Sequence, residues 1–337
     1  MIEIDGSEGE GGGQIVRNAC ALALVTGQSF RIRNVRGKRS KPGLMRQHLT
    51  AVEAAAAIGA AECTGLAVGS SEISFAPGKV TPGEYHFAVG TAGSTGLVLQ
   101  TVLIPLLLAG GPSRLVIEGG THAMQAPPFE FLDQVFLPVI NRMGPQVQAR
   151  LARHGFYPRG GGRIEVDITP APLQPVDCLD RGALQSVRAR ALVAGLDQEI
   201  GQRELKTAGS KLAWAQELLV LDAIPAEYGP GNALLLEATF EHGCEIVSGF
   251  GRVGLSAEHL AKDAAGRMAG LLKSAAFAGP YLADQLLLPF ALAGGGTFST
   301  VKPSQHSLTA ADIIARFTGR RWRFAQQADG CFHARLS

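Results

Sequence analysis

Cysteine is scarce in this chain of 337 residues, and the few that occur show no ordered spacing. No Cys-x-x-Cys pair is present, and the five thiols are scattered over Cys20, Cys63, Cys178, Cys244 and Cys331. A zinc-ribbon or disulfide-rich domain needs clustered or regularly spaced cysteines, so both classes are excluded. Scattered free thiols are typical of a reducing compartment, and we expect a cytoplasmic protein.

Strong net charge and long hydrophobic runs are also missing. The net charge is only +2, so any nucleic-acid binding must come from a local patch. The longest apolar run, residues 98–109, is interrupted by Gln100, Thr101 and Pro105 and is too short to cross a bilayer. The first residues lack the basic and apolar segments of a signal peptide, so we expect no membrane association.

Glycine, by contrast, is abundant, and five of the eight residues from 6 to 13 are glycine. A glycine-rich turn before a helix presents backbone N–H groups at the positive end of the helix dipole, which favours an anion. Glu10 lies in this loop, and Gln14 and Arg17 share one helix face just beyond it. A flexible loop without a ligand fits the same spacing, and no Gly-Lys-Ser/Thr follows to make a P-loop.

A second candidate binding segment is the most basic part of the chain. Five of the eleven residues from 36 to 46 are lysine or arginine. Arg36, Arg39, Arg46 and Gln47 lie in this loop and at the start of the helix expected after it. Clustered cations in such a place suit the phosphates of a nucleic acid, although a solvated charged loop explains the pattern equally well.

One histidine near the C-terminus has neighbours suited to chemistry. His306 lies between Ser304 and Thr309, whose hydroxyls we expect to orient its ring. A neutral imidazole attacks phosphorus without first losing a proton, so it is a competent nucleophile near neutral pH. Upstream, Asp284 and Gln285 place a carboxylate and an amide at the head of an apolar helix. A single histidine is more often structural than catalytic, and Asp284 alone also fits a helix cap.

The order of helices and strands repeats along the chain. Each repeat shows helices that end at glycine and are followed by strands, with helices expected over 49–58, 96–108, 129–143, 283–293 and 310–317. One such unit cannot cover both faces of its helix pair, so several units must pack together. The pattern predicts an α+β fold of three repeated βαβαββ units packed around their helices.

Residues 182–278 do not follow this repeat. They favour helices over 211–221 and 257–277, and strands over 186–194, 234–240 and 244–251. We interpret them as a small α+β domain inserted between the second and third units. The predicted large domain then combines residues 1–181 with residues 279–337.

Six segments, in order, resemble the RNA 3′-terminal phosphate cyclases. They are residues 8–17, 41–50, 92–101, 154–162, 281–285 and 304–309, of which the run His154-Gly-Phe-Tyr-Pro-Arg-Gly-Gly-Gly162 is highly specific. The resemblance implies three repeated units with one inserted domain. It also implies an ATP-dependent ligase that converts an RNA 3′-phosphate to a 2′,3′-cyclic phosphate, forming AMP and diphosphate. The implied route passes through a covalent histidyl-AMP and an adenylylated RNA 3′ end.

The resemblance also implies roles for individual residues. His306 would be the nucleophile, and Glu10 would hold a divalent metal, Mg²⁺ or Mn²⁺, on the phosphates of ATP. The implied ATP-binding residues are Gln14, Gln100, Pro127, Phe131, Tyr281, Leu282, Ala283, Asp284 and Gln285. The implied contacts to the triphosphate and the RNA end are Arg17, Arg36, Arg39, Arg46 and Gln47. A ring at Phe131 would stack on the base, although Phe131 and Tyr281 also fit ordinary core aromatics.

One departure from the family pattern and two competing functions remain. Ala310 stands where many cyclases have asparagine after the threonine, which would loosen the site. The first competing function is a non-catalytic relative that binds RNA or protein in ribosome biogenesis, but such a scaffold needs no nucleophile like His306. The second is an enolpyruvyl-transferase-like enzyme, which shares the repeated units but lacks both this histidine and the insertion.

Overall fold

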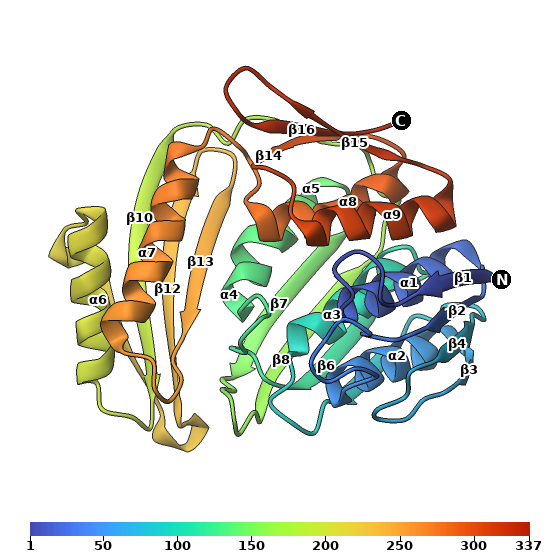
Figure 1. Ribbon diagram of the computed structural model, residues 1–337, viewed down its shortest axis with the longest axis horizontal. Coiled ribbons are helices and arrows are strands. Elements are labelled where there is room, and N and C mark those ends of the chain that lie inside the picture. The colour runs from blue at the N-terminus through green and yellow to red at the C-terminus, as the bar shows by residue number, and fades with distance from the viewer.

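The computed structural model describes all 337 residues, and its strands form four four-stranded sheets. Three of these sheets share one strand order, in which the first two strands pair in parallel and the other two pairings are antiparallel. In Figure 1 they lie at the right, in the centre and at the top of the molecule. This shared topology confirms the α+β class and the repeated βαβαββ unit.

The first two units follow each other along the chain. The first unit comprises β1 (Ile2–Asp5), α1 (Gly13–Thr26), β2 (Phe30–Arg33), α2 (Arg46–Gly59), β3 (Glu62–Thr64) and β4 (Ile73–Ala76). The second unit comprises β5 (Glu84–Ala88), α3 (Thr95–Leu107), β6 (Ser113–Gly119), α4 (Phe129–Phe131), a π-helical turn (Leu132–Phe136), α5 (Leu137–Arg142), β7 (Gln146–Arg153) and β8 (Gly162–Thr169).

The third unit is split by the insertion. It comprises β9 (Asp177–Cys178), α8 (Pro280–Ala293), β14 (Thr297–Thr300), α9 (Gln305–Thr318), β15 (Trp322–Gln326) and β16 (Phe332–Leu336). Because β9 pairs in parallel with β14, the unit already begins at residue 177. The inserted segment therefore follows the first strand of the third unit, where we had expected it to fall between two complete units. A two-residue strand gives too short a pattern to be found from sequence.

The inserted segment has its own sheet, of order β11-β10-β12-β13, which stands at the left of Figure 1 with two helices beside it. Its elements are β10 (Leu184–Ala194), α6 (Glu199–Leu212), β11 (Leu219–Ile224), β12 (Gly231–Phe240), β13 (Cys244–Phe250) and α7 (Ala257–Lys273). A hydrophobic cluster of 14 buried residues lies inside this segment, apart from the 68-residue core that joins the repeated units. The exact domain bounds 1–181 with 279–337, and 182–278, stay a prediction.

Two expected helices differ from those observed. The helix predicted over 211–221 is wrong, because α6 ends at Leu212 and Ala213 adopts a left-handed backbone with φ 54°. The predicted helix overlaps the start of β11 (Leu219–Ile224), which pairs with β10. Sheet pairing therefore overrides helix propensity in this segment. At the C-terminal end, α9 begins at Gln305 and not at residue 310, which brings His306 into its first turn. None of the helices combines the length and apolar composition that a membrane crossing needs.

Candidate active site

The residues predicted to do chemistry meet near the starts of three helices. Gln14 lies in the first turn of α1, His306 in the first turn of α9, and Asp284 early in α8. Helix α9 packs against both α1 and α8, so residues from the two ends of the chain come together. The N-cap of α8 is Gly279, so Asp284 is not the helix cap that its sequence position also allowed.

A hydrogen-bonded chain runs from Asp284 through Gln14 to His306. The Nε2 amide of Gln14 donates to Oδ1 of Asp284, so its Oε1 faces the histidine. This oxygen lies 3.1 Å from Nδ1 of His306. Since Oε1 can only accept, Nδ1 carries the hydrogen and donates it. The lone pair of the neutral ring is therefore on Nε2, which makes no hydrogen bond.

Glu10 is the group that faces this free nitrogen. Its Oε1 lies 3.8 Å from Nε2 of His306, and its side chain is only 8% exposed. Both carboxylate oxygens are buried and accept no hydrogen bond, although the guanidinium of Arg39 forms an ion pair with Oε1. Buried carboxylate oxygens are normally hydrogen-bonded or bound to a metal. The open oxygens of Glu10 thus fit a divalent cation, which prefers oxygen ligands.

Two hydroxyl residues that we expected to orient the ring have other partners. Thr309 Oγ1 accepts a hydrogen bond of 2.9 Å from the backbone N–H of Glu10 and donates to the carbonyl of Gln305. Ser304 caps α9 by accepting from the N–H of Ser307 at 3.1 Å. The expectation is therefore wrong in detail: Thr309 fastens the glycine-rich loop to α9, and it is Gln14 that orients the ring.

The charges around the site favour the neutral imidazole. Burial lowers the pKa of His306, and Arg39 and Arg17 lower it further, while Asp284 opposes them. Burial also raises the pKa of Asp284 and lowers that of Arg17 to about 10. A histidine whose pKa is lowered stays unprotonated at neutral pH, which a nucleophile requires.

A pocket opens beside this chain between α1, α3 and α8. Its lining includes the predicted Gln14, Arg17, Gln100, Asp284 and Gln285, and the residues Asn18, Leu103, Ile104, Phe136 and Leu288, which were not predicted. Oε1 of Gln285 is buried there without a partner. Asn18 could have been predicted from the sequence as a lining residue, because it lies four residues after Gln14 on the same helix face. The apolar members carry no such signal, because in the sequence they look like any core residue.

The whole chain matches known proteins. The family profile described as RNA 3′-terminal phosphate cyclase matches residues 8–324. The chain belongs to the RNA 3′-terminal phosphate cyclase family. A protein of that name from Koribacter versatilis is 50% identical over 100% of this chain and 95% of its own length. Cyclases from Pseudomonas fluorescens (49% identical) and Salmonella enteritidis (44% identical) each cover 94% of this chain, which covers 92% and 93% of theirs.

Several residues that the cyclase resemblance assigned to ATP do not line this pocket. Phe131 is 1% exposed and belongs to the hydrophobic core, so its ring has no free face for a base. Leu282 and Ala283 are equally buried, and Pro127 is half-buried in the loop before α4. Tyr281 is 55% exposed in the first turn of α8. ATP binding by these five residues stays a prediction.

Part of the basic segment of this chain, residues 36–46, forms hydrogen bonds within its own loop. The guanidinium of Arg36 donates to the carbonyls of Lys41 and Gly43, at 2.6 and 2.9 Å, and so braces the loop. Arg46 is exposed at the start of α2, and Gln47 accepts from the N–H of Ser94 at 3.3 Å. Of the predicted phosphate contacts, Arg17 and Arg39 are therefore the two whose charges act on His306.

Proposed function

We propose that this chain is an RNA 3′-terminal phosphate cyclase with ATP and RNA ending in a 3′-phosphate as its substrates. The observation that carries the proposal is the uncommitted Nε2 of His306, which faces the open carboxylate of Glu10 beside a polar pocket. Family membership supports the same reaction. A non-catalytic RNA-binding relative is the alternative, but it has no use for an oriented free imidazole.

The first step is attack of Nε2 on the α-phosphorus of ATP. A P–N bond forms, the bond to the bridging oxygen breaks, and diphosphate leaves. The ring gains positive charge as its lone pair is used, and the Nδ1–H bond to Gln14 strengthens accordingly. Asp284, bonded to the same amide, supplies the compensating negative charge. The Asp284–Gln14–His306 chain thus stabilises charge where it develops.

The second and third steps transfer and then expel the adenylate. An oxygen of the RNA 3′-phosphate attacks the phosphorus on His306, the P–N bond breaks, and a phosphoanhydride forms. The adjacent 2′-hydroxyl then attacks the RNA phosphorus, loses its proton to water, and releases AMP. The 2′,3′-cyclic phosphate closes within one nucleotide, so little positioning entropy remains to be lost.

Negative charge accumulates on the phosphates throughout these steps. Glu10 would hold a divalent metal, which would supply positive charge to the phosphates. Arg17 and Arg39 supply positive charge from the protein. Both are near enough to His306 for their charges to lower its pKa. The glycine-rich loop keeps Glu10 in place through its N–H bond to Thr309.

The test is conversion of an end-labelled RNA 3′-phosphate in the presence of ATP and Mg²⁺ or Mn²⁺. We expect a product whose end resists phosphatase, with one AMP formed per cyclic end. His306→Ala should form neither product. Binding of the RNA without any AMP, under every metal tested, would instead support the non-catalytic alternative.

A further inference from the structure

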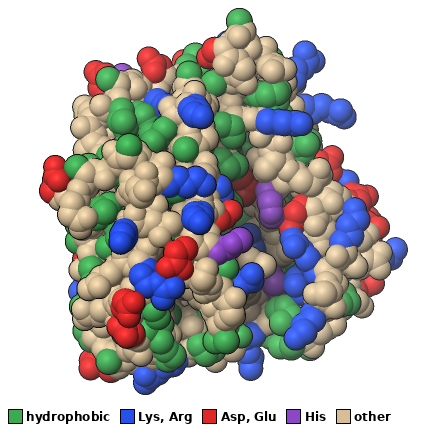
Figure 2. All heavy atoms as spheres, turned by 60° about the vertical axis from the view of Figure 1, so that its left-hand side comes forward, with side chains coloured by type: hydrophobic (Ala, Val, Ile, Leu, Met, Phe, Trp, Pro, Cys, Tyr) green, Lys and Arg blue, Asp and Glu red, His purple; other side chains and the backbone are tan.

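A second hollow lies away from the pocket, where the β7–β8 connection faces the inserted domain. Its lining residues are Arg153, His154, Arg159, Gly160, Gly161, Glu227 and Tyr228, and its volume is about 370 Å³. Ligand sites typically have volumes of about 300–1,000 Å³. We call it the β7–β8 groove. The face drawn in Figure 2 shows histidine side chains along a hollow that lysine and arginine side chains border.

Cations and aromatic rings are combined in this groove. Arg159 donates only to the backbone carbonyl of Glu227, at 2.6 Å, and has no carboxylate partner. Arg153 lies 4.0 Å from Glu118, with both side chains in contact with water, so this pair is weak. Tyr228 lines the groove, and Tyr157 is 62% exposed on the β7–β8 connection. The carboxylate of Glu227 is the one negative group in the lining.

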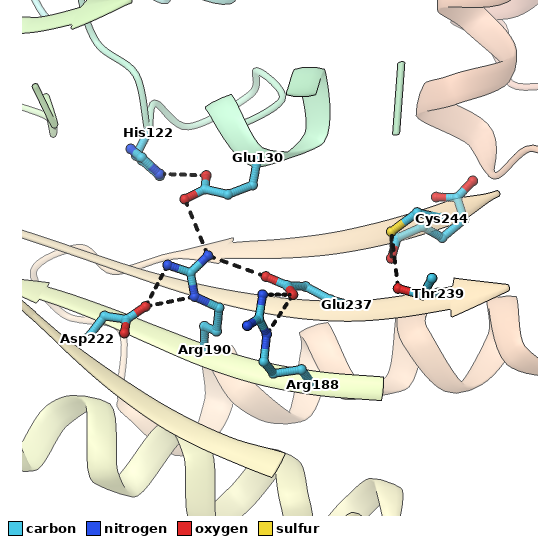
Figure 3. Close-up of polar contacts among 9 residues, drawn as sticks. His122, Glu130, Arg188, Arg190, Asp222, Glu237, Thr239 and Cys244 are labelled. Atoms are coloured by element: carbon cyan, nitrogen blue, oxygen red, sulfur yellow. Dashed lines mark hydrogen bonds and ion pairs between the residues drawn. The ribbon is translucent and has the colours of Figure 1, made fainter. Parts of the chain in front are cut away.

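The two sides of the groove are fastened together by a buried polar network. The ring of His154 stacks on His122, with centroids 5.3 Å apart, and Nε2 of His122 lies 2.9 Å from Glu130. As Figure 3 shows, Glu130 points toward Arg190 of β10, which also pairs with Asp222 of β11. Strand β11 leads directly into the turn that carries Glu227 and Tyr228. The groove is therefore held at a defined width.

The groove connects to the nucleophile through consecutive contacts. A Cβ on Gly160 would collide with Thr91 and Ala92, so the loop holding Gly160 packs directly on that backbone. The next residues of that backbone reach Gln47, which accepts from Ser94. His48 follows Gln47 and packs on Gly13, beside Gln14 of the site. The loop of the groove is thus linked to the residues beside His306 by direct packing.

We propose that the β7–β8 groove binds the single-stranded RNA nucleotides that precede the 3′-terminal phosphate. The proposal rests on the proposed function, because it takes the strand's end to be the substrate at His306. Arginines beside stackable rings are the usual means of holding unpaired RNA, whereas a small anion needs no aromatic surface. Burial lowers the pKa of His154 to about 4, so its ring offers a stacking surface and no charge at neutral pH.

The test measures binding of 3′-phosphate RNA, without ATP, to wild-type protein and to Arg153→Ala/Arg159→Ala. Oligonucleotides range from a dinucleotide to about twelve nucleotides, within the length that one such site covers. We expect wild-type affinity to rise with length. The double variant should bind the longest RNA at least about tenfold more weakly, and its log–log salt slope should fall by about 1.4 for two lost phosphate contacts.

Matched variants separate this outcome from general charge or folding effects. Arg203→Ala/Arg267→Ala removes an exposed arginine from α6 and a half-buried one from α7, and should leave length dependence and salt slope as in the wild type. Tyr228→Ala should weaken binding of the longest RNA at least about fivefold. Tyr228→Phe keeps the aromatic ring and should bind this RNA as the wild type does. Thermal melting of each variant checks its fold.

Equal affinity and equal salt slope for the groove variant and the wild type would overturn the proposal. So would a wild-type affinity that does not change between the dinucleotide and the longest RNA. Because binding is measured without ATP, absence of cyclisation would count against the proposed function alone. Conversely, a cyclase that is active but insensitive to the groove variants would keep its function and lose this subsite.

Discussion

Two clusters of histidine and carboxylate occur in this molecule, and they differ in what is left unbonded: His122 is buried, whereas the side chain of His306 is 51% exposed. In the network of Figure 3, Nε2 of His122 is engaged by Glu130 at 2.9 Å. Its other ring nitrogen, Nδ1, lies 2.9 Å from the hydroxyl of Thr121. At the candidate active site, one nitrogen of His306 is engaged by Gln14 and the other faces Glu10 without a hydrogen bond.

The same contrast holds for the carboxylates. Burial would raise the pKa of Glu130, but the charge and hydrogen bond of His122, with Arg190, lower it to about 2. The oxygens of Glu10 are buried and accept no hydrogen bond. His122 and Glu130, whose polar atoms have partners, stabilise the fold, whereas a free ring nitrogen facing carboxylate oxygens that accept no hydrogen bond is suited to a ligand.

The largest expected difference is between two matched histidine variants. His306→Asn should lower ATP-dependent self-adenylylation at least about 10³-fold, because asparagine keeps polarity but offers no nucleophilic nitrogen. His122→Asn should retain the reaction below its melting temperature, since it lies in the structural network. Both are measured as protein-bound label from α-labelled ATP. Loss of label in both variants would contradict the claim that only the His306 cluster takes part in the reaction.

The second difference is in stability. Glu130→Ala should lower the free energy of unfolding by about 3 kcal/mol, because it leaves the buried His122 without its partner and removes one of the carboxylates that face Arg190. Glu10→Ala should change it by no more than about 1 kcal/mol, since Arg39 is 41% exposed and water can solvate it. Urea unfolding measures both.

The cost of Glu130→Ala should also depend on pH. The folded-state pKa of Glu130 lies below its ordinary 4.5, so its contribution is present above pH 4.5. That contribution should disappear as the pH falls through the folded-state value of about 2. A constant difference between wild type and Glu130→Ala from pH 6 down to about 2 would contradict the ion-pair explanation.

A third, smaller effect concerns the metal. Glu10→Gln should raise the Mg²⁺ or Mn²⁺ concentration needed for half-maximal self-adenylylation at least about tenfold, since an amide is a poorer cation ligand than a carboxylate. The control is Glu8→Gln. Glu8 lies two residues before Glu10, and its exposed carboxylate is paired with Arg316. Identical metal titrations for the two variants would exclude Glu10 as a ligand.

The smallest effect is a shift of the pH profile. Asp284 raises the pKa of His306 and Arg39 lowers it. Asp284→Asn should therefore move the acid limb of the self-adenylylation rate to lower pH, and Arg39→Ala should move it to higher pH. The rate is measured across the acid limb of each variant. Shifts in the same direction would show that these charges do not act on the nucleophile.

The repeated units could be predicted because their signals are local. Helices α1, α8 and α9 end at Gly27, Gly294 and Gly319, all in the left-handed conformation that glycine favours. The start of the third unit could not be found, because β9 is defined only by its pairing with β14 across the insertion. In the same way, the first residues of β11 were expected to end a helix over 211–221, but they form a strand because β10 pairs with them.

Some members of the candidate site were predictable from the sequence, but its bonding was not. His306 and Gln14 are 292 residues apart, and Gln14 and Asp284 are 270 apart, so only the fold shows that they form one chain. Sequence proximity wrongly favoured Ser304 and Thr309 as the groups that orient the ring. The burial of Phe131 could not be predicted either, since an aromatic residue in a core and one in a base-stacking pocket have the same sequence pattern.

The most direct test is to locate the covalent adduct. Wild-type protein is incubated with α-labelled ATP and metal, without RNA, digested, and its peptides are sequenced by mass spectrometry. We expect one AMP per chain, labile in acid and stable in base, on the peptide that contains His306. An adduct on any other residue, or no adduct at any metal concentration and pH, would contradict the assignment of this imidazole as the nucleophile.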